Sequence, residues 1–217
     1  MFNNLRYDIN SIMKRDPAAR NPVEVFLLYS GFHAVMWHRI ANWFYRHDMK
    51  FMARFVSQLN RFLTGVEIHP AATIGRGLLI DHGMGVVIGE TAVIGDNCTI
   101  YQCVTLGGTG KETGKRHPTL GNNVMVGSGA KVLGPLDIGN NSKIAAGAVV
   151  LCDVPPNSTA VGIPARIVRR DGEAVVQEFD LDQVHISDPV TQQLCTMSVQ
   201  LTKLQKELEE LKNKQND

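Results

Sequence analysis

The sequence predicts a mainly β fold, in which short parallel strands wind into a coil after a group of α-helices and before one further helix. The first observation is a repeat: between Ile68 and Val150 an aliphatic residue returns at every sixth position, with two interruptions. The second observation is that glycine often follows the aliphatic residue, as at Gly75 and Gly89. A period of six fits neither a 3.6-residue helix nor a two-residue strand alternation. It is typical of a parallel β-helix, because glycine lets the backbone turn tightly between flat strands.

The repeat also predicts the core. No single coil can bury its own faces, so the core forms only when neighbouring coils stack. Each inward aliphatic side chain then contributes roughly 1.5–3 kcal/mol. The inward positions are Ile68, Ile74, Ile80, Ile88, Ile94, Ile100, Leu106, Leu120, Val126, Val132, Ile138, Ile144 and Val150. Such a scaffold carries no chemistry by itself, so function has to be sought where the repeat is interrupted.

The first interruption lies between Ile80 and Ile88, where the step is eight residues and the inserted corner contains Asp81 and His82. A neutral imidazole can take a proton from a nucleophile, an effect worth about 10² to 10⁴ in rate. Glu67, directly before the first repeat, could orient that imidazole if it reaches the far ring nitrogen. The alternative is a solvated corner histidine without a role.

The second interruption lies between Leu106 and Leu120, where the step is fourteen residues. Residues 107–118 are polar, basic and rich in glycine, so we expect an exposed loop. The loop carries Arg116 and His117. A guanidinium can hold a substrate carboxylate through two parallel hydrogen bonds. The alternative is an ordinary polar loop.

Three helices are expected ahead of the repeat. Apolar residues at three- to four-residue spacing predict a first helix that ends near Asp16. The second begins at Pro22, with Asn21 as its N-cap, and runs to about Tyr45. The third covers residues 50–63 and stops before a glycine. An aspartate directly before a proline is usually a turn residue, and the pattern alone gives Asp16 no other role.

The carboxyl-terminal part contains different patterns. Residues 161–167 predict a short final strand, and residues 171–189 are typical of a linker. After the linker, leucines recur at alternating steps of three and four, which predicts a short coiled coil or a solvated tail helix packed on its own chain. We therefore divide the chain into an α-helical amino-terminal region (1–65), a β-helix domain (66–170) and a linker with a carboxyl-terminal helix (171–217).

The bulk composition narrows the possible partners. The chain has 217 residues, 44% of them hydrophobic, which is enough for one substantial domain with appendages. Its net charge of +1 gives no reason to expect nucleic acid or an anionic membrane as a partner. Residues 1–15 show no signal peptide and no membrane span. The cysteines show no metal-type pairing, which favours reduced thiols in a cytoplasmic protein. They are Cys98, Cys103, Cys152 and Cys195.

Several motifs closely resemble those of the serine O-acetyltransferases, a family of hexapeptide-repeat acyltransferases. The longest covers residues 80–95 and reads IDHGMGVVIGETAVIG. It is joined by YQCVTLGGTG from Tyr101, RHP from Arg116 and VGIPAR from Val161, and ahead of the repeat by RDPA, GFHA and VEIHP. The resemblance covers about residues 5–170, and its motifs are specific to this family rather than to hexapeptide proteins in general.

The resemblance implies a left-handed parallel β-helix that assembles as a homotrimer, with active sites between neighbouring subunits. It implies transfer of an acetyl group from acetyl-CoA to the hydroxyl of L-serine, which gives O-acetylserine for cysteine synthesis. L-cysteine would act as a feedback inhibitor at the serine site, and no metal is expected.

The resemblance also implies roles for individual residues. His82 matches the general base, and Glu67 matches the acid that orients it, where the family often has aspartate. The serine-binding set would be Asp16, Asp81, Arg116 and His117. The positions that contact acetyl-CoA would be Gly108, Ser128 and Ala146.

Two departures from the family concern assembly. Long members carry a further amino-terminal helical segment that joins two trimers into a hexamer. This sequence begins too late to contain it, so a trimer is expected. Long members also insert an apolar last residue into O-acetylserine sulfhydrylase, whereas this sequence ends in Lys214-Gln-Asn-Asp217, which argues against that complex.

Three other functions remain open. A metal hydratase similar to γ-type carbonic anhydrase would need three converging histidines. No third histidine closely follows His82 and His117, since Asn122 and Asn123 stand where a nearby ligand would be. A non-catalytic trimeric scaffold would leave the pairs Asp81–His82 and Arg116–His117 unexplained. Another acyltransferase of the superfamily, using a similar histidine on sugars or drugs, is the main alternative.

Overall fold

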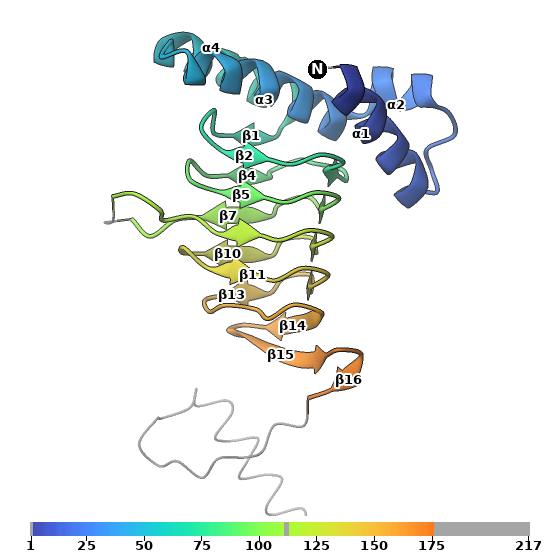
Figure 1. The fold of residues 1–217 in the computed structure, drawn as a ribbon, viewed down its shortest axis with the longest axis vertical. Coiled ribbons are helices and arrows are strands. Elements are labelled where there is room, and N and C mark those ends of the chain that lie inside the picture. The colour runs from blue at the N-terminus through green and yellow to red at the C-terminus, as the bar shows by residue number, and fades with distance from the viewer. Residues whose placement is uncertain (1, 111–112, 176–217) are drawn as a thin grey trace, which may run out of the picture. The chain divides into compact units, whose positions relative to one another are not determined.

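The computed structural model describes residues 2–110 and 113–175. The predicted coiled coil and most of the predicted linker lie outside these residues. Figure 1 shows the helices gathered at one end of a stack of short strands. The helices are α1 (Phe2–Arg15), α2 (Pro22–Leu28), α3 (Ser30–Arg46) and α4 (Lys50–Thr64).

The prediction of one continuous second helix is wrong in one respect. In the structure this helix is broken into α2 and α3 at Tyr29. Its start is confirmed, since the Asn21 side chain accepts a hydrogen bond from the backbone N of Glu24 at 2.9 Å. Tyr29 has an extended backbone (φ −84°, ψ 105°). The break allows α3 to begin directly on the β-helix, where a Cβ at Gly31 would lie only 2.0 Å from the carbonyl oxygen of Ile80. Only glycine permits this approach.

The strands form three faces of a parallel β-helix. The first face contains β1 (Glu67–Ile68), β4 (Val87–Ile88), β7 (Thr105–Gly107), β10 (Lys131–Leu133) and β13 (Val149–Val150). The second face contains β2 (Thr73–Ile74), β5 (Val93–Ile94), β8 (Thr119–Leu120) and β11 (Asp137–Ile138). The third face contains β3 (Leu79–Ile80), β6 (Thr99–Ile100), β9 (Met125–Val126), β12 (Lys143–Ile144) and β14 (Ser158–Gly162).

The third face continues into two antiparallel strands, β15 (Ala165–Arg170) and β16 (Glu173–Ala174). The prediction of one strand over residues 161–167 is therefore wrong, because the chain reverses direction between β14 and β15.

Three corners join the faces. The histidine corner joins the third face to the first and consists of residues 81–86, 101–104, 127–130 and 145–148. The loop corner joins the first face to the second, and its described residues are 69–72, 89–92, 108–110, 113–118 and 134–136. The asparagine corner joins the second face to the third and consists of residues 75–78, 95–98, 121–124 and 139–142. The two insertions in the repeat therefore lie at different corners.

The inward positions of the repeat form the core, as predicted. Each of them is buried apart from Ile74, which is partly buried against the same cluster. The strand register explains this, because Ile68 pairs with Ile88 and Ile88 pairs with Leu106. The same aliphatic position is thus repeated from coil to coil, and each coil covers the side chains of the next.

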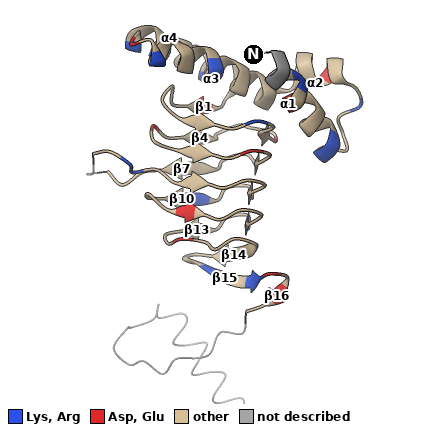
Figure 2. Cartoon of the chain, in the orientation of Figure 1, with Lys and Arg blue, Asp and Glu red and all other residues tan. Residues whose placement is uncertain are grey.

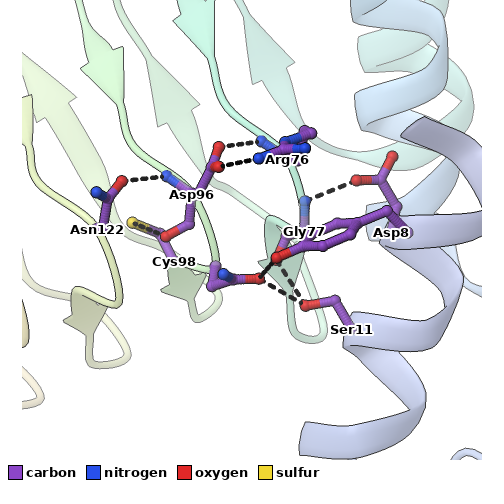
Figure 3. A network of polar contacts seen from close by, with 9 residues as sticks. Asp8, Ser11, Arg76, Gly77, Asp96, Cys98 and Asn122 are labelled. Atoms are coloured by element: carbon purple, nitrogen blue, oxygen red, sulfur yellow. Dashed lines mark hydrogen bonds and ion pairs between the residues drawn. The ribbon is translucent and has the colours of Figure 1, made fainter. Parts of the chain in front are cut away.

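Polar side chains connect successive coils at the asparagine corner (Figure 3). The backbone N of Arg76 donates to Asp96 Oδ1 at 2.7 Å, and the backbone N of Asp96 donates to Asn122 Oδ1 at 2.8 Å. The backbone N of Asn122 in turn donates to Asn140 Oδ1 at 2.7 Å. The next residue on each coil has a positive φ, as Asn97 does (59°), which asparagine tolerates better than most residues.

Helix α1 is fixed to this corner by two charged side chains. The Asp8 carboxylate accepts a hydrogen bond from the backbone N of Gly77 at 2.7 Å, as Figure 3 shows. The Arg15 guanidinium donates to the carbonyl oxygens of Gly77, Asn97 (2.8 Å) and Cys98 (2.9 Å). Burial lowers the pKa of Arg15 from its ordinary value. Since Arg15 ends α1, these bonds also fix the position of the residue that follows the helix.

Candidate active site

His82 stands on the inserted turn of the histidine corner. The backbone N of Asp81 donates to the Ile100 carbonyl at 2.8 Å, so the strand pairing continues up to this residue. His82 then has a positive φ of 59°, and Gly83 follows with 70°. The imidazole is left 75% exposed, with its Nε2 3.9 Å from Asp81 Oδ1. The turn therefore presents an accessible base beside a carboxylate.

Glu67 lies at the start of the first face and is paired with a different residue. Its backbone N donates to the Val86 carbonyl at 2.9 Å, and its carboxylate lies 3.0 Å from the Arg61 guanidinium of α4. In the described part of the chain, His82 has an ion-pair contact with Asp81 and none with Glu67. The orienting role of Glu67 therefore remains a prediction, and it requires this carboxylate to turn toward the imidazole.

Asp16 lies directly after α1, and both of its carboxylate oxygens accept hydrogen bonds. The Tyr29 hydroxyl donates to Oδ2 at 2.7 Å, and the backbone N of Ala18 donates to Oδ1 at 2.8 Å. Burial, followed by the hydrogen bond to Asp16, raises the pKa of Tyr29 to about 12, with a smaller contribution from the charge of Asp81. Because Gly31, two residues after Tyr29, packs against the Ile80 carbonyl, Asp16 and Asp81 lie on the same side of the molecule.

Arg116 lies near the end of the long loop and is held by Glu90. The guanidinium donates to Glu90 Oε2 at 2.8 Å, and each side chain is about one third exposed, 34% and 37% respectively. The hydrogen bond from Arg116 holds the pKa of Glu90 below its ordinary value. Because a guanidinium has five N–H donors, Arg116 can remain paired with Glu90 and still bind a carboxylate.

Thr91 fixes both the loop and the tautomer of His117. The Thr91 hydroxyl oxygen accepts hydrogen bonds from the backbone N of Arg116 and of His117, both at 3.0 Å. Its own proton is directed to His117 Nδ1 at 2.9 Å, and the backbone N of Thr91 donates to the same nitrogen at 3.2 Å. Nδ1 is therefore an acceptor, and the neutral ring carries its proton on Nε2.

The His117 ring is packed between two glycines. A Cβ at Gly89 would lie 1.9 Å from His117 Cδ2, and a Cβ at Gly108 would lie 2.9 Å from its Nε2. His117 is only 7% exposed, and burial, together with the positive charge of Arg116, lowers the pKa of its imidazole. His117 is thus a neutral hydrogen-bond donor rather than a proton acceptor at neutral pH.

The three predicted acetyl-CoA positions do not lie together in one chain. Gly108 is at the loop corner beside His117. Ser128 and Ala146 lie on successive coils of the histidine corner, where the backbone N of Gly147 donates to the Ser128 carbonyl at 2.8 Å. A ligand that contacts all three would therefore have to lie between a histidine corner and a loop corner.

The predicted site residues fall into two groups at opposite edges of the first face. At the histidine corner, or next to it on the helices, are Asp16, Asp81, His82, Ser128 and Ala146. At the loop corner are Gly108, Arg116 and His117. The strands of the first face run from one corner to the other, so one chain does not bring the two groups together.

Comparison with known proteins places this geometry in a family. A model described as "Serine acetyltransferase, N-terminal" matches residues 1–36, and one described as "Bacterial transferase hexapeptide (six repeats)" matches residues 117–152. A serine acetyltransferase of Bacillus pumilus (strain SAFR-032) is 52% identical over 214 residues, which is 99% of this chain and 98% of the relative. The chain belongs to the serine acetyltransferase family. It is an acyltransferase with the family's left-handed parallel β-helix.

Solved structures of the family match as well. The serine acetyltransferase of Neisseria gonorrhoeae in complex with serine is 46% identical, with a TM-score of 0.75 over 77% of this chain and 69% of that chain. That of Brucella abortus strain S19 in complex with coenzyme A is 45% identical, with a TM-score of 0.76 over 81% and 69% of the two chains. A serine acetyltransferase in complex with cysteine is 44% identical, with a TM-score of 0.77 over 78% and 66%.

The described residues contain neither a metal site nor a membrane-spanning helix. No group of three His, Cys, Asp or Glu side chains there could hold a metal ion. None of the helices in this part of the chain is long and apolar enough to cross a membrane. Charged residues of both signs are spread over the helices and the β-helix (Figure 2).

Three residues that hydrogen-bond the predicted site residues were not predicted from the sequence. They are Tyr29, Glu90 and Thr91. A signal for Glu90 and Thr91 was available, because Ile94 pairs with Leu120 and the two are 26 positions apart. The same offset of 26 places Glu90 beside Arg116 and Thr91 beside His117. No comparable signal exists for Tyr29, because its position depends on how the helices dock.

Proposed function

We propose that the chain transfers the acetyl group of acetyl-CoA to the hydroxyl of L-serine, giving O-acetylserine and CoA. The observation that carries this proposal is the accessible imidazole of His82, 3.9 Å from the Asp81 carboxylate on a turn inserted into the repeat. The family relationship supports it, since relatives have been solved with serine and with coenzyme A.

In the proposed reaction His82 acts first as a general base and then as a general acid. The serine oxygen attacks the thioester carbonyl carbon while the imidazole takes the hydroxyl proton. The tetrahedral intermediate then collapses, the carbon–sulfur bond breaks, and the imidazolium returns the proton to the CoA sulfur. Glu67, the acid predicted to orient the imidazole, would turn toward the ring and stabilise the imidazolium between these steps. The acetyl group thus passes directly from one substrate to the other.

The charges of the two groups of site residues are complementary to the carboxylate and the ammonium group of serine. Arg116, already oriented by Glu90, would bind the carboxylate through parallel hydrogen bonds. Asp16 and Asp81 would receive the ammonium group. His117 would contribute its Nε2–H as a neutral donor close to the carboxylate. An acceptor with one carboxylate and one ammonium fits this arrangement better than a sugar does.

This arrangement requires two copies of the chain, because the two groups lie at opposite edges of the first face. We propose that the histidine corner of one copy faces the loop corner of the next. Such a head-to-tail contact closes into a ring, and a homotrimer is the smallest ring in which every copy has two different neighbours. Each trimer would then contain three equivalent sites.

Acetyl-CoA would lie along the same junction. Ser128 and Ala146 of one copy and Gly108 of the next would line it, which brings together the positions that one chain keeps apart. L-cysteine would compete with serine, since it carries the same ammonium and carboxylate and differs only in its thiol. A relative has been solved in complex with cysteine. Cys98, Cys103 and Cys152 are free thiols, which favours a reducing, cytoplasmic location.

The main alternative is acetyl transfer to another acceptor by the same histidine. The deciding experiment incubates the protein with acetyl-CoA and a panel of amino acids and sugars, and follows the release of free thiol. We expect rapid release with L-serine alone, and inhibition by L-cysteine that is competitive with serine. Release with a sugar but not with serine would contradict the proposal, and no release with any acceptor would favour a non-catalytic role.

A further inference from the structure

Tyr29 holds Asp16, the acidic residue that lies on the helices next to the histidine corner. It occupies the break between α2 and α3, and its hydroxyl donates to Asp16 Oδ2 at 2.7 Å. The backbone N of Ala18 donates to the other oxygen at 2.8 Å. Each oxygen of Asp16 therefore has one fixed donor and keeps a further lone pair for a ligand.

The docking of α3 explains why Tyr29 lies there. Gly31 packs against the Ile80 carbonyl so closely that a Cβ would lie 2.0 Å from its oxygen. Ser30 lies over the inserted turn, where a Cβ at Gly83 would be 3.8 Å from the Ser30 hydroxyl oxygen. The residue before them, Tyr29, is thereby held at the end of β3, close to the residues that follow that strand.

The charge balance of this region favours a cationic ligand. Arginine and lysine form ion pairs with several carboxylates in the described part of the chain, but neither Asp16 nor Asp81 has such a partner. The hydroxyl of Tyr29 stays protonated at neutral pH, as an ordinary tyrosine with a pKa near 10 does, and its pKa is raised further to about 12. It can therefore orient Asp16 without neutralising it, whereas a lysine in the same place would cancel the negative charge.

We infer that Tyr29 is a positioning residue of the serine site, which orients the Asp16 carboxylate so that Asp16 and Asp81 can both receive the ammonium group of the amino-acid substrate. This inference rests on the proposed function. Tyr29 does not touch the reacting atoms, and its effect on the reaction passes through Asp16.

The test is Tyr29→Phe, which removes only the hydroxyl. We expect the KM for serine to rise about tenfold, as the loss of a hydrogen bond to a charged group predicts. The KM for acetyl-CoA, kcat and the melting temperature should stay close to those of the parent protein. Tyr7→Phe is the matched control, because it also removes a tyrosine hydroxyl that donates to a side-chain oxygen, at 3.1 Å to Asn97, but at the asparagine corner. It should leave both KM values unchanged.

A double-mutant cycle separates positioning from a general structural role. In an Asp16→Asn background, Tyr29→Phe should raise the KM for serine less than twofold, because its route of action is already removed. A full tenfold effect in that background would overturn the inference, as would an unchanged serine KM or equal rises for both substrates in the single variant. A parent protein that fails to acetylate serine would instead refute the proposed function, so the two failures are distinguishable.

Discussion

The Thr91 hydroxyl lies 2.9 Å from His117 Nδ1, and its oxygen also accepts the backbone N–H groups of Arg116 and His117. One side chain on the coil before the long loop thus fixes the two functional residues at the end of that loop. The loop can be long and glycine-rich because its return to the β-helix is determined at this point.

Thr91→Val should therefore reduce both activity and stability. Valine keeps the shape of threonine but leaves two backbone N–H groups without an acceptor, a change that costs about 1–3 kcal/mol when the groups are buried. We expect kcat/KM for serine to fall about tenfold or more, and calorimetry to show a loss of stability at the low end of that range, since both hydrogen bonds are only partly buried. Thr73→Val, at an exposed position of the second face, is the control and should change neither. Wild-type kinetics in Thr91→Val would show that the loop is fixed by other contacts.

Gly89→Ala should displace the His117 ring. The added methyl would lie 1.9 Å from Cδ2 and 2.1 Å from Nε2, so the imidazole must leave its position. Overpacking of this kind typically costs about 1–3 kcal/mol, and we expect a lower melting temperature together with a large loss of kcat/KM for serine. Gly110→Ala, which would meet nothing within 4 Å, should behave like the parent protein. Equal kinetics of the two variants would argue against a role for His117.

His82→Asn tests the general base while preserving the turn. His82 has a positive φ of 59°, a conformation that asparagine tolerates but alanine does not favour. We expect kcat to fall by about 10² to 10⁴, with acetyl-CoA binding unchanged in calorimetry. His47→Asn, at an exposed position outside the site, is the control. Near-normal turnover of His82→Asn would remove His82 from the mechanism.

Much of this fold could be predicted from the sequence, because it depends on local periodicity. The six-residue repeat places each inward side chain, and Gly65 ends α4 with φ 73°, as the predicted stop before a glycine requires. The break at Tyr29 could not be predicted, since residues 22–46 keep a helical pattern across it. It results from the close approach of Gly31 to Ile80, which is a tertiary contact.

The candidate site was predictable in part for the same reason. Asp81 and His82 share one turn, and Arg116 and His117 share one loop, so each pair could be recognised locally. The pairing of Glu67 with Arg61 depends on where α4 lies, and the sequence contains no pattern that reports it. The two pairs lie at different corners, and this could not be predicted without the order of the three faces. That order becomes clear only when the repeat is folded into coils.

Because His38 is buried, we expect the folded chain to lose stability at acidic pH. Burial lowers the pKa of His38 to about 4, whereas an unfolded histidine titrates near 6.5. Because the folded pKa is the lower one, the unfolded chain binds the proton first, and stability is lost as pH falls from about 6.5 to about 4. Above pH 6.5 this contribution is fully present. Denaturant melts should therefore show a steeper loss of stability across this window for the parent than for His38→Gln. The exposed His47→Gln should keep the parent slope.

The last prediction concerns the sharing of the site between copies. His82→Asn and Arg116→Ala chains should each be nearly inactive alone, since every site in such a homotrimer lacks one group. The two chains are unfolded together in equal amounts and refolded. A site is then complete if the copy that supplies His82 is an Arg116→Ala chain and the neighbouring copy, which supplies Arg116, is a His82→Asn chain. With random assembly each condition holds half the time, so about a quarter of the sites should be complete. We expect about a quarter of the parent activity after co-refolding, none after mixing of folded trimers that do not exchange, and a mass of three chains by light scattering.

A co-refolded sample that stays inactive while trimeric would show that both groups of one site come from the same chain. A chain with both substitutions, co-refolded with the parent in equal amounts, is the control, since it should also leave about a quarter of the sites intact.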